Sequence, residues 1–279
     1  MSDAPDGRVV PAAAPALEFR GVSFSYGAPV GVELERRAVI DGFSLSIPAG
    51  GITGIVGPNG CGKSTLLKLA DGLLRPQVGR VLVSGRDVAA MSSCERARAI
   101  ALLPQVHRTP SMTVRDLVMC GRYARMGVFG RAGAADTAAV DEALRALDLV
   151  DLARKPARSL SGGERQRAFL AMVLAQGADT LLLDEPTTYL DVAAAHETMA
   201  LARRLNRERG ITAVVVIHDI DLALRSCDHI VVMGSGSVRA EGAPRDPEVL
   251  AAIGEAFGAS VLPVDTALGR AYAVFAREG

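Results

Sequence analysis

A glycine-rich segment followed by a lysine and a serine is the clearest chemical signal in this sequence. It reads Gly57-Pro58-Asn59-Gly60-Cys61-Gly62-Lys63-Ser64-Thr65 and fits the pattern G-x-x-x-x-G-K-[ST]. Glycines let successive backbone N–H groups point inward around a β-phosphate, and the positive end of the following helix adds to their effect. Lys63 would place its charge between the β- and γ-phosphates, and Ser64 would ligate magnesium. The segment therefore predicts a site for a nucleoside triphosphate with Mg²⁺.

Two acidic residues that end an apolar stretch could supply the rest of a hydrolytic site. Asp184 and Glu185 directly follow Thr180-Leu181-Leu182-Leu183. If this stretch is a parallel strand, both carboxylates lie at the carboxyl edge of the sheet, where ligands bind in such folds. Asp184 would hold magnesium through a water, and Glu185 could act as general base on the attacking water. Acidic residues are also common where a strand reaches solvent, so the pair alone is weak evidence for a hydrolytic site. Together with the phosphate loop, it becomes strong evidence.

A serine and two glycines precede a second long helical pattern. The segment is Leu160-Ser161-Gly162-Gly163-Glu164-Arg165-Gln166. Free amides and the positive end of the helix dipole attract an anion at such a position. Because one ATP needs only one phosphate cradle, we expect Ser161, Gly162 and Gly163 to serve the nucleotide bound by another copy. The sequence therefore predicts a homodimer with two ATP sites between the copies.

The elements that must position these residues alternate between short β-branched runs and helical stretches. This alternation favours an α/β domain with a mostly parallel sheet. Thr113 and Asp116 form a capping-box pattern that predicts a helix start. A largely helical insertion is expected over Thr113–Gln176. The expected strands are Gly51–Val56, Ile100–Leu103, Thr180–Asp184, Ala213–Ile217, Ile230–Met233 and Val238–Glu241.

Composition excludes several other classes of protein. The chain has 31 Lys plus Arg against 31 Asp plus Glu, so no net field draws it to nucleic acid or to an anionic membrane. Its four cysteines form no C-x-x-C pair, which argues against a zinc site or a disulfide framework. No signal peptide or membrane-spanning apolar run is visible. If the protein serves a membrane, we expect it to do so through partners.

In their order along the chain, these motifs resemble the ATP-binding cassette family, and Leu160–Gln166 is similar to its signature sequence. The resemblance covers the chain from about Leu17 onward. It implies an α/β fold, with a P-loop NTPase RecA-like core, an antiparallel β subdomain and an inserted α-helical subdomain. It also implies ATP hydrolysis with ATP and Mg²⁺. The expected boundaries are a disordered tail at 1–16, a discontinuous core at 17–105 and 178–245, a helical subdomain at 106–177 and a C-terminal extension at 246–279.

The resemblance also implies roles for residues that carry no strong signal alone. Tyr26 would stack on adenine, although it could instead be a turn aromatic. Gln105 would reach magnesium and the lytic water, and His218 would contact the γ-phosphate. Asp191 would cross the dimer interface, where Ser161 and Gly163 would touch the opposite γ-phosphate.

Several segments look like the ATPases of importers for iron-siderophores, haem and cobalamin. This subclass implies an integral membrane permease that docks near Gln105, an extracytoplasmic solute-binding protein as an indirect partner, and a place at the cytoplasmic face of the membrane. Two rivals stay open: a soluble assembly factor of the same family, and a regulator that binds ATP without turnover. The segments are Gly121-Arg122-Tyr123, Ala171–Gln176, Thr187–Asp191, His218-Asp219 and Ala256-Phe257-Gly258.

Cys61 lies inside the phosphate loop and has two interpretations. Nearby amides at the positive end of a helix could depress the pKa of its thiol, which predicts that alkylation inactivates the protein and that ATP protects it. Alternatively, Cys61 is a small residue that fills a tight turn.

Overall fold

The central sheet has six strands, in the order β10-β9-β3-β8-β7-β6. The computed structural model describes residues 15–27, 38–105, 108–126, 131–267 and 269–276. All neighbouring pairs in this sheet are parallel except β9 and β10, so the expected mostly parallel α/β fold is confirmed. The strands are β3 (Ile52–Val56), β6 (Ile100–Leu103), β7 (Thr180–Asp184), β8 (Thr212–Val216), β9 (His229–Gly234) and β10 (Ser237–Gly242).

The strand bounds expected from the sequence are close to those observed, with shifts of one residue at some ends. β3 begins after Gly51, and β8 begins at Thr212 and ends before Ile217. Every residue of β3, β7 and β8 is buried. This is the continuous apolar pattern of parallel strands that are covered on both faces.

A second, antiparallel sheet has the order β2-β1-β4-β5. Its strands are β1 (Leu17–Phe24), β2 (Ile40–Ile47), β4 (Val78–Val83) and β5 (Arg86–Asp87). The expected tail at 1–16 lies outside the described residues up to residue 14. Ala16, the last residue of that range, is buried; its amide donates to Ile47 O, and its carbonyl oxygen accepts from Ser84 N. Ala16 therefore bonds to this sheet next to the start of β1.

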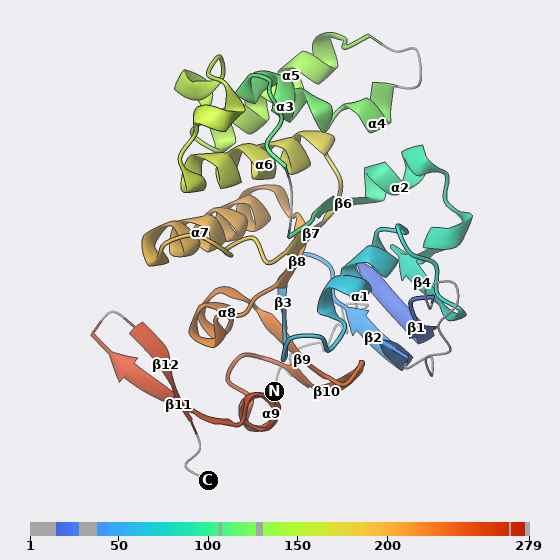
Figure 1. Cartoon of the computed structure of the whole chain (residues 1–279), viewed down its shortest axis with the longest axis vertical. Helices are drawn as coiled ribbons and strands as arrows, with labels where there is room; N and C mark the ends of the chain where they lie inside the picture. Colours follow the sequence, from blue (N-terminus) through green and yellow to red (C-terminus); the bar gives the residue numbers. More distant parts are fainter. Residues whose placement is uncertain (1–14, 28–37, 106–107, 127–130, 268, 277–279) are drawn as a thin grey trace, which may run out of the picture.

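The helical insertion forms one end of the molecule, as Figure 1 shows. It begins where Thr113 caps a helix: the Thr113 hydroxyl accepts from the Asp116 amide, and the Asp116 carboxylate accepts from that hydroxyl. This confirms the predicted helix start. The helices are α3 (Val114–Cys120), α4 (Tyr123–Met126), α5 (Ala134–Ala146) and α6 (Gly162–Gln176), with 3-10 turns η2 (Val150–Leu152) and η3 (Ala157–Ser159).

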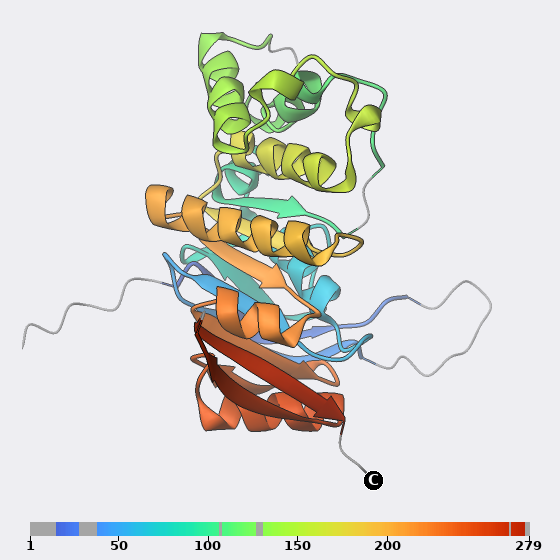
Figure 2. The ribbon, with the colours of Figure 1, turned by 90° about the vertical axis from the view of Figure 1, so that its left-hand side faces the viewer.

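The remaining helices cover the central sheet or extend the chain beyond it. Figure 2 shows α7 and α8 across one face of this sheet, and α9 with a two-stranded hairpin at the end opposite the helical insertion. No helix in the described part of the chain combines the length and apolar character needed to cross a membrane. These elements are α1 (Lys63–Ala70), η1 (Val88–Ala90), α2 (Ser93–Ala99), α7 (Val192–Arg209), α8 (Ile220–Ser226), α9 (Pro247–Phe257), β11 (Ala259–Thr266) and β12 (Gly269–Ala276).

Two clusters of buried apolar side chains hold these layers together. One cluster runs from Val114 and Phe169 in the helical insertion, through Leu181 in the central sheet, to Val249 in α9. The other joins the antiparallel sheet to α1 and the facing side of the central strands, and it includes an edge-to-face pair of Phe19 and Phe43. The loop between β3 and α1 is therefore held between two packed layers.

Candidate functional site

The phosphate loop joins the buried strand β3 to α1, as its sequence predicts. Two of its glycines allow close packing that a side chain would prevent. A Cβ on Gly57 would lie 2.4 Å from Met233 O, and a Cβ on Gly62 would lie 2.6 Å from Ile40 Cδ1. Gly62 also has a φ of 104° and is the N-cap of α1. The loop conformation therefore depends on glycine at these two positions.

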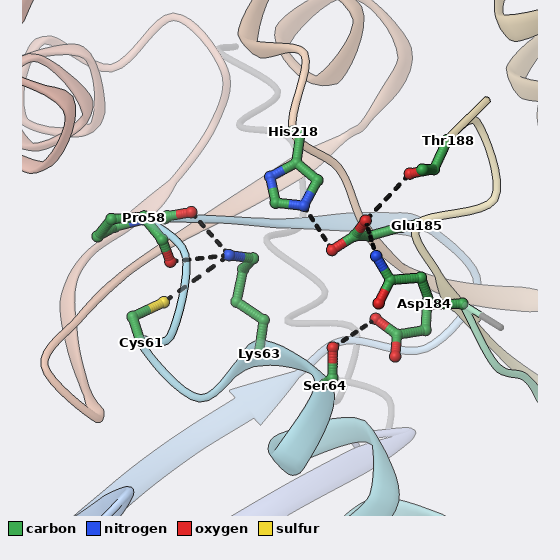
Figure 3. A network of polar contacts seen from close by, with 10 residues as sticks. Pro58, Cys61, Lys63, Ser64, Asp184, Glu185, Thr188 and His218 are labelled. Carbon is green, nitrogen blue, oxygen red and sulfur yellow. Dashed lines mark hydrogen bonds and ion pairs between the residues drawn. The ribbon is translucent and has the colours of Figure 1, made fainter. Parts of the chain in front are cut away.

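Lys63 is buried at the start of α1, and its amino group reaches back over the loop. Its Nζ donates to Gly57 O at 2.7 Å and to Pro58 O at 3.0 Å (Figure 3). A buried ammonium needs such acceptors because it has lost its water. The loop therefore holds a full positive charge beside the backbone N–H groups of a helix start, which suits a phosphate group.

Ser64 and Asp184 meet between α1 and the end of β7. The Ser64 hydroxyl donates to Asp184 Oδ1 at 2.9 Å. Burial raises the pKa of Asp184, the hydrogen bond from Ser64 opposes this change, and the nearby Glu185 adds to it. A bound divalent cation would compensate for the cost of burying this carboxylate.

The residues present fit Mg²⁺. In the described ranges, no three His, Cys, Asp or Glu side chains gather so that they could hold an ion by themselves. Mg²⁺ typically uses one or two protein oxygens together with waters and substrate phosphates. The Ser64 hydroxyl and the Asp184 carboxylate form such an oxygen set beside the phosphate loop.

The carboxylate of Glu185 is the meeting point of three segments that each follow a parallel strand. Gln105, after β6, donates its Nε2 to Glu185 Oε2. His218 Nε2, after β8, contacts Oε1 (Figure 3). Thr188 Oγ1 donates to Oε2 at 3.0 Å. Glu185 itself has a φ of 51°, an unusual conformation that often occurs at functional sites. The structure thus brings together the three side chains expected to be catalytic.

Thr188 is a site residue that sequence reasoning did not single out. It lies three residues after Glu185, and its hydroxyl shares Oε2 of that carboxylate with Gln105. In the sequence, Thr187-Thr188-Tyr189 indicates only the importer subclass. The sequence feature that could have indicated Thr188 is the turn that must follow the acids at the end of the strand, because a hydroxyl in that turn can hydrogen-bond to them.

A cavity of about 610 Å³ connects the phosphate loop with Glu185. This volume lies in the range of small-ligand pockets. Tyr26 is at its rim, half exposed, with its hydroxyl 3.2 Å from Thr65 Oγ1 and its ring edge-to-face with Phe24. The lining residues are Tyr26, Val39, Asn59, Gly60, Gly62, Lys63, Ser64, Thr65, Gln105, Glu185 and His218.

The residues of the second predicted cradle lie outside this cavity. Ser161 caps α6 through its hydroxyl, which accepts from the Glu164 amide, while the Glu164 carboxylate accepts from the Ser161 amide. Asp191 caps α7 and is exposed. Gly162 lines a different cavity, together with Gln105 and Tyr189. Within one chain, the structure does not bring Ser161, Gly163 or Asp191 to the phosphate loop.

The idea that Cys61 has a lowered pKa is wrong. Cys61 is 3% exposed, and burial raises the pKa of its thiol, which the charge of Lys63 opposes only in part. The amides at the positive helix end therefore lower the pKa of the thiol by less than burial of the sulfur raises it. Cys61 fits the alternative interpretation, a small residue that fills a tight turn.

We accordingly expect a thiol-alkylating reagent at about pH 8 to modify the exposed Cys94 at least about tenfold faster than Cys61, because reaction requires an accessible thiolate. Peptide mass spectrometry over time measures both rates. In Cys94→Ser, Cys61 should stay unmodified over the period in which Cys94 reacts in the parent protein. Equal rates at the two cysteines would contradict this expectation.

Comparison with known proteins agrees with this geometry. The sequence profile described as "ABC transporter" matches residues 40–188. The chain is 42% identical over 214 residues to the iron(3+)-hydroxamate import ATP-binding protein FhuC of Bacillus subtilis, covering 76% of this chain and 80% of that protein. It is 40% identical to the ferric enterobactin transport ATP-binding protein FepC of Escherichia coli, covering 82% and 85%.

Two further similarities bear on substrate and assembly. The cobalamin import ATP-binding protein BtuD of Halobacterium salinarum is 45% identical, covering 82% of this chain and 58% of that protein. Among solved structures, a dimeric ATP-binding cassette in a post-hydrolysis state, bound to ADP and Pi, is similar with a TM-score of 0.71 and 27% identity. That alignment covers 82% of this chain and 99% of the other.

Proposed function

This chain belongs to the ABC transporter family of ATP-binding proteins, and from that premise we propose that it hydrolyses ATP to power the import of a metal chelate of the siderophore or cobalamin type. The observation that carries the proposal is the meeting of Gln105, Glu185 and His218 beside the loop of Lys63. The chelate type is supported by the names of the relatives, which include importers of ferric hydroxamate, enterobactin and cobalamin. Haem stays a prediction from the sequence.

In the proposed reaction, the chain positions a water and stabilises charge rather than forming a covalent intermediate. Lys63 and the loop amides bind the β- and γ-phosphates. Ser64 and Asp184 would hold Mg²⁺, which would neutralise phosphate charge. Glu185 accepts a proton from the attacking water. Gln105, Thr188 and His218 fix the orientation of that carboxylate, which supports its role as the base.

We propose that a second copy completes each ATP site. The exposed helix start at Ser161 and Gly162 and the exposed Asp191 lie away from the chain's own phosphate loop, so they are free to reach the nucleotide of a partner copy. The dimeric state of the similar ATP-binding cassette supports this arrangement. Dimer closure on ATP, followed by opening after hydrolysis, would move the attached partners.

The proposed partners are integral membrane permease subunits at the cytoplasmic face of the membrane and, indirectly, a solute-binding protein. The import roles named for the relatives support a permease over the rival reading of a soluble assembly factor. The permease would bind near Gln105, and the transported chelate would not touch this chain.

A reconstitution experiment tests the proposal. The chain is co-expressed with a candidate integral membrane permease, purified in detergent, placed in liposomes and assayed for ATP hydrolysis and for uptake of a ferric siderophore or cobalamin. We expect a stable complex and uptake that requires ATP. Strong ATPase activity without any permease association would favour the assembly factor, and ATP binding without turnover in every assembly would favour the regulator.

A further inference from the structure

A second polar cavity, of about 450 Å³, lies at the edge of the central sheet opposite the phosphate loop. Asp228, which lines it, accepts a hydrogen bond from the amide of Ile52 at the start of β3, whereas the phosphate loop follows the end of β3. The two cavities share no lining residue. The lining residues here are Arg203, Leu224, Arg225, Cys227, Asp228, Ala243, Pro244, Arg245, Arg270 and Tyr272.

Four arginines from four separate segments converge on this cavity, which we call the arginine pocket. Arg203 comes from α7, Arg225 from α8, Arg245 from the loop after β10, and Arg270 from β12. Figure 1 shows α8 beside the hairpin of β11 and β12. Because the four residues are far apart in the sequence, only the packed fold brings their charges together.

Two of these guanidinium groups already have carboxylate partners. Arg225 pairs with Asp221 at 3.4 Å, and Arg270 pairs with Asp265 through two hydrogen bonds of 2.6 and 3.0 Å. Their charge is therefore largely neutralised within the chain.

The other two guanidinium groups have no such partner. Arg203 donates Nη1 to Arg225 O at 2.9 Å, and within the described ranges no carboxylate forms an ion pair with Arg203 or Arg245. Asp228 is the acidic residue of the lining, and its Oδ2 accepts from Ile52 N. The hydrogen bond from Arg270 lowers the pKa of the Asp265 carboxyl group, and Arg245 lies close enough for its charge to help lower it. An anion that enters the pocket would therefore meet the donors of Arg203 other than Nη1 and the guanidinium of Arg245, neither of which forms an ion pair in the described part of the chain.

We propose that the arginine pocket binds a small phosphate-bearing anion, held chiefly by Arg203 and Arg245. Since the other two arginines of the pocket have carboxylate partners, the charges of Arg203 and Arg245 face only the single carboxylate of Asp228 among the lining residues, which leaves a net positive charge for an anion. The guanidinium fork matches phosphate oxygens in pairs. Donors reach this cavity from four segments, and a tetrahedral phosphate accepts hydrogen bonds from all sides, whereas a carboxylate accepts mainly in its own plane. The volume admits a di- or triphosphate group.

Calorimetric titration with tripolyphosphate tests the proposal on the full chain, in buffer without Mg²⁺, which tripolyphosphate would chelate, and with the nucleotide cavity first saturated by ADP. We expect one binding event. Arg245→Gln and Arg203→Gln should each weaken it about tenfold or more, because each removes charge-assisted hydrogen bonds. Arg145→Gln removes the same charge from an exposed position on α5 and should change the affinity less than about twofold.

Arg245 is exposed and its side chain forms no ion pair within the described residues, so Arg245→Gln is expected to fold even if Arg203→Gln does not; circular dichroism checks both. Four results would overturn the proposal. In the first, all three variants weaken tripolyphosphate binding equally. In the second, tripolyphosphate displaces ADP and its affinity is unchanged in the two pocket variants. In the third, citrate binds as tightly as tripolyphosphate. In the fourth, no binding is detectable at millimolar tripolyphosphate.

Discussion

The variant Glu185→Gln is expected to hydrolyse ATP about a hundredfold or more slowly than the parent chain while it still binds ATP. The change keeps the size of the side chain and removes the proton acceptor, and general-base catalysis contributes on this scale. Gln105 and Thr188 donate to the Glu185 carboxylate, and His218 contacts it, so the group is held in place for one task. Binding should persist because Lys63 and the loop amides are untouched.

Steady-state phosphate release and equilibrium binding of a fluorescent ATP analogue measure the two properties separately. Glu255→Gln is a matched control, because Glu255 is an exposed glutamate on α9, far from the nucleotide cavity. It should leave both properties unchanged. If Glu185→Gln hydrolysed ATP at the parent rate, Glu185 would not be the base.

The variant Gly163→Asp should abolish ATP-driven dimer formation and lower hydrolysis about a hundredfold, while a single copy still binds ATP. A Cβ at Gly163 would meet only Ala194 Cβ, at 3.6 Å, which is an ordinary van der Waals distance, so the chain's own fold has room for a Cβ at this position. In the proposed dimer, a carboxylate at this helix start would face the γ-phosphate of the partner's nucleotide and repel it. A loss of dimer formation and hydrolysis would therefore show that a second copy contributes to the site. The expected decrease of about a hundredfold in hydrolysis reflects the lost stabilisation of charge in the transition state.

Light scattering with ATP, in the slowly hydrolysing Glu185→Gln background, measures dimer formation, and phosphate release measures turnover in the otherwise unchanged chain. Gly133→Asp is the control, because Gly133 is the N-cap of α5 in the same subdomain and a Cβ there has ordinary space. Aspartate is favourable at an N-cap, so this variant should behave like the parent. If the Gly163→Asp chain formed dimers and hydrolysed ATP normally, the proposed dimer, in which Gly163 of one copy contacts the nucleotide of the other, would be wrong.

Much of the site could be predicted because its residues lie at the ends of strands and helices that the sequence marks clearly. The parallel sheet brings Gln105, Glu185 and His218 to one edge, since each follows an apolar strand. Ser161 was predictable as a helix start for the same local reason.

What the sequence could not supply depends on contacts between distant segments. The hydroxyl of Thr188 matters only because a left-handed turn at Glu185 brings it back to the carboxylate. The raised pKa of Cys61 follows from burial, which competes with the helix dipole and cannot be weighed without packing. The arginine pocket needs α7, α8 and the C-terminal hairpin in place.

The apolar cluster shared by the helical insertion and the central sheet should make these two parts unfold together. Val114 and Phe169 pack in the same continuous cluster as Leu181 and Val249. An excised insertion would expose this surface to water, so the insertion should not act as a portable module. Its most protected amide protons should exchange with deuterium together with those of the central strands, in one cooperative opening of both parts.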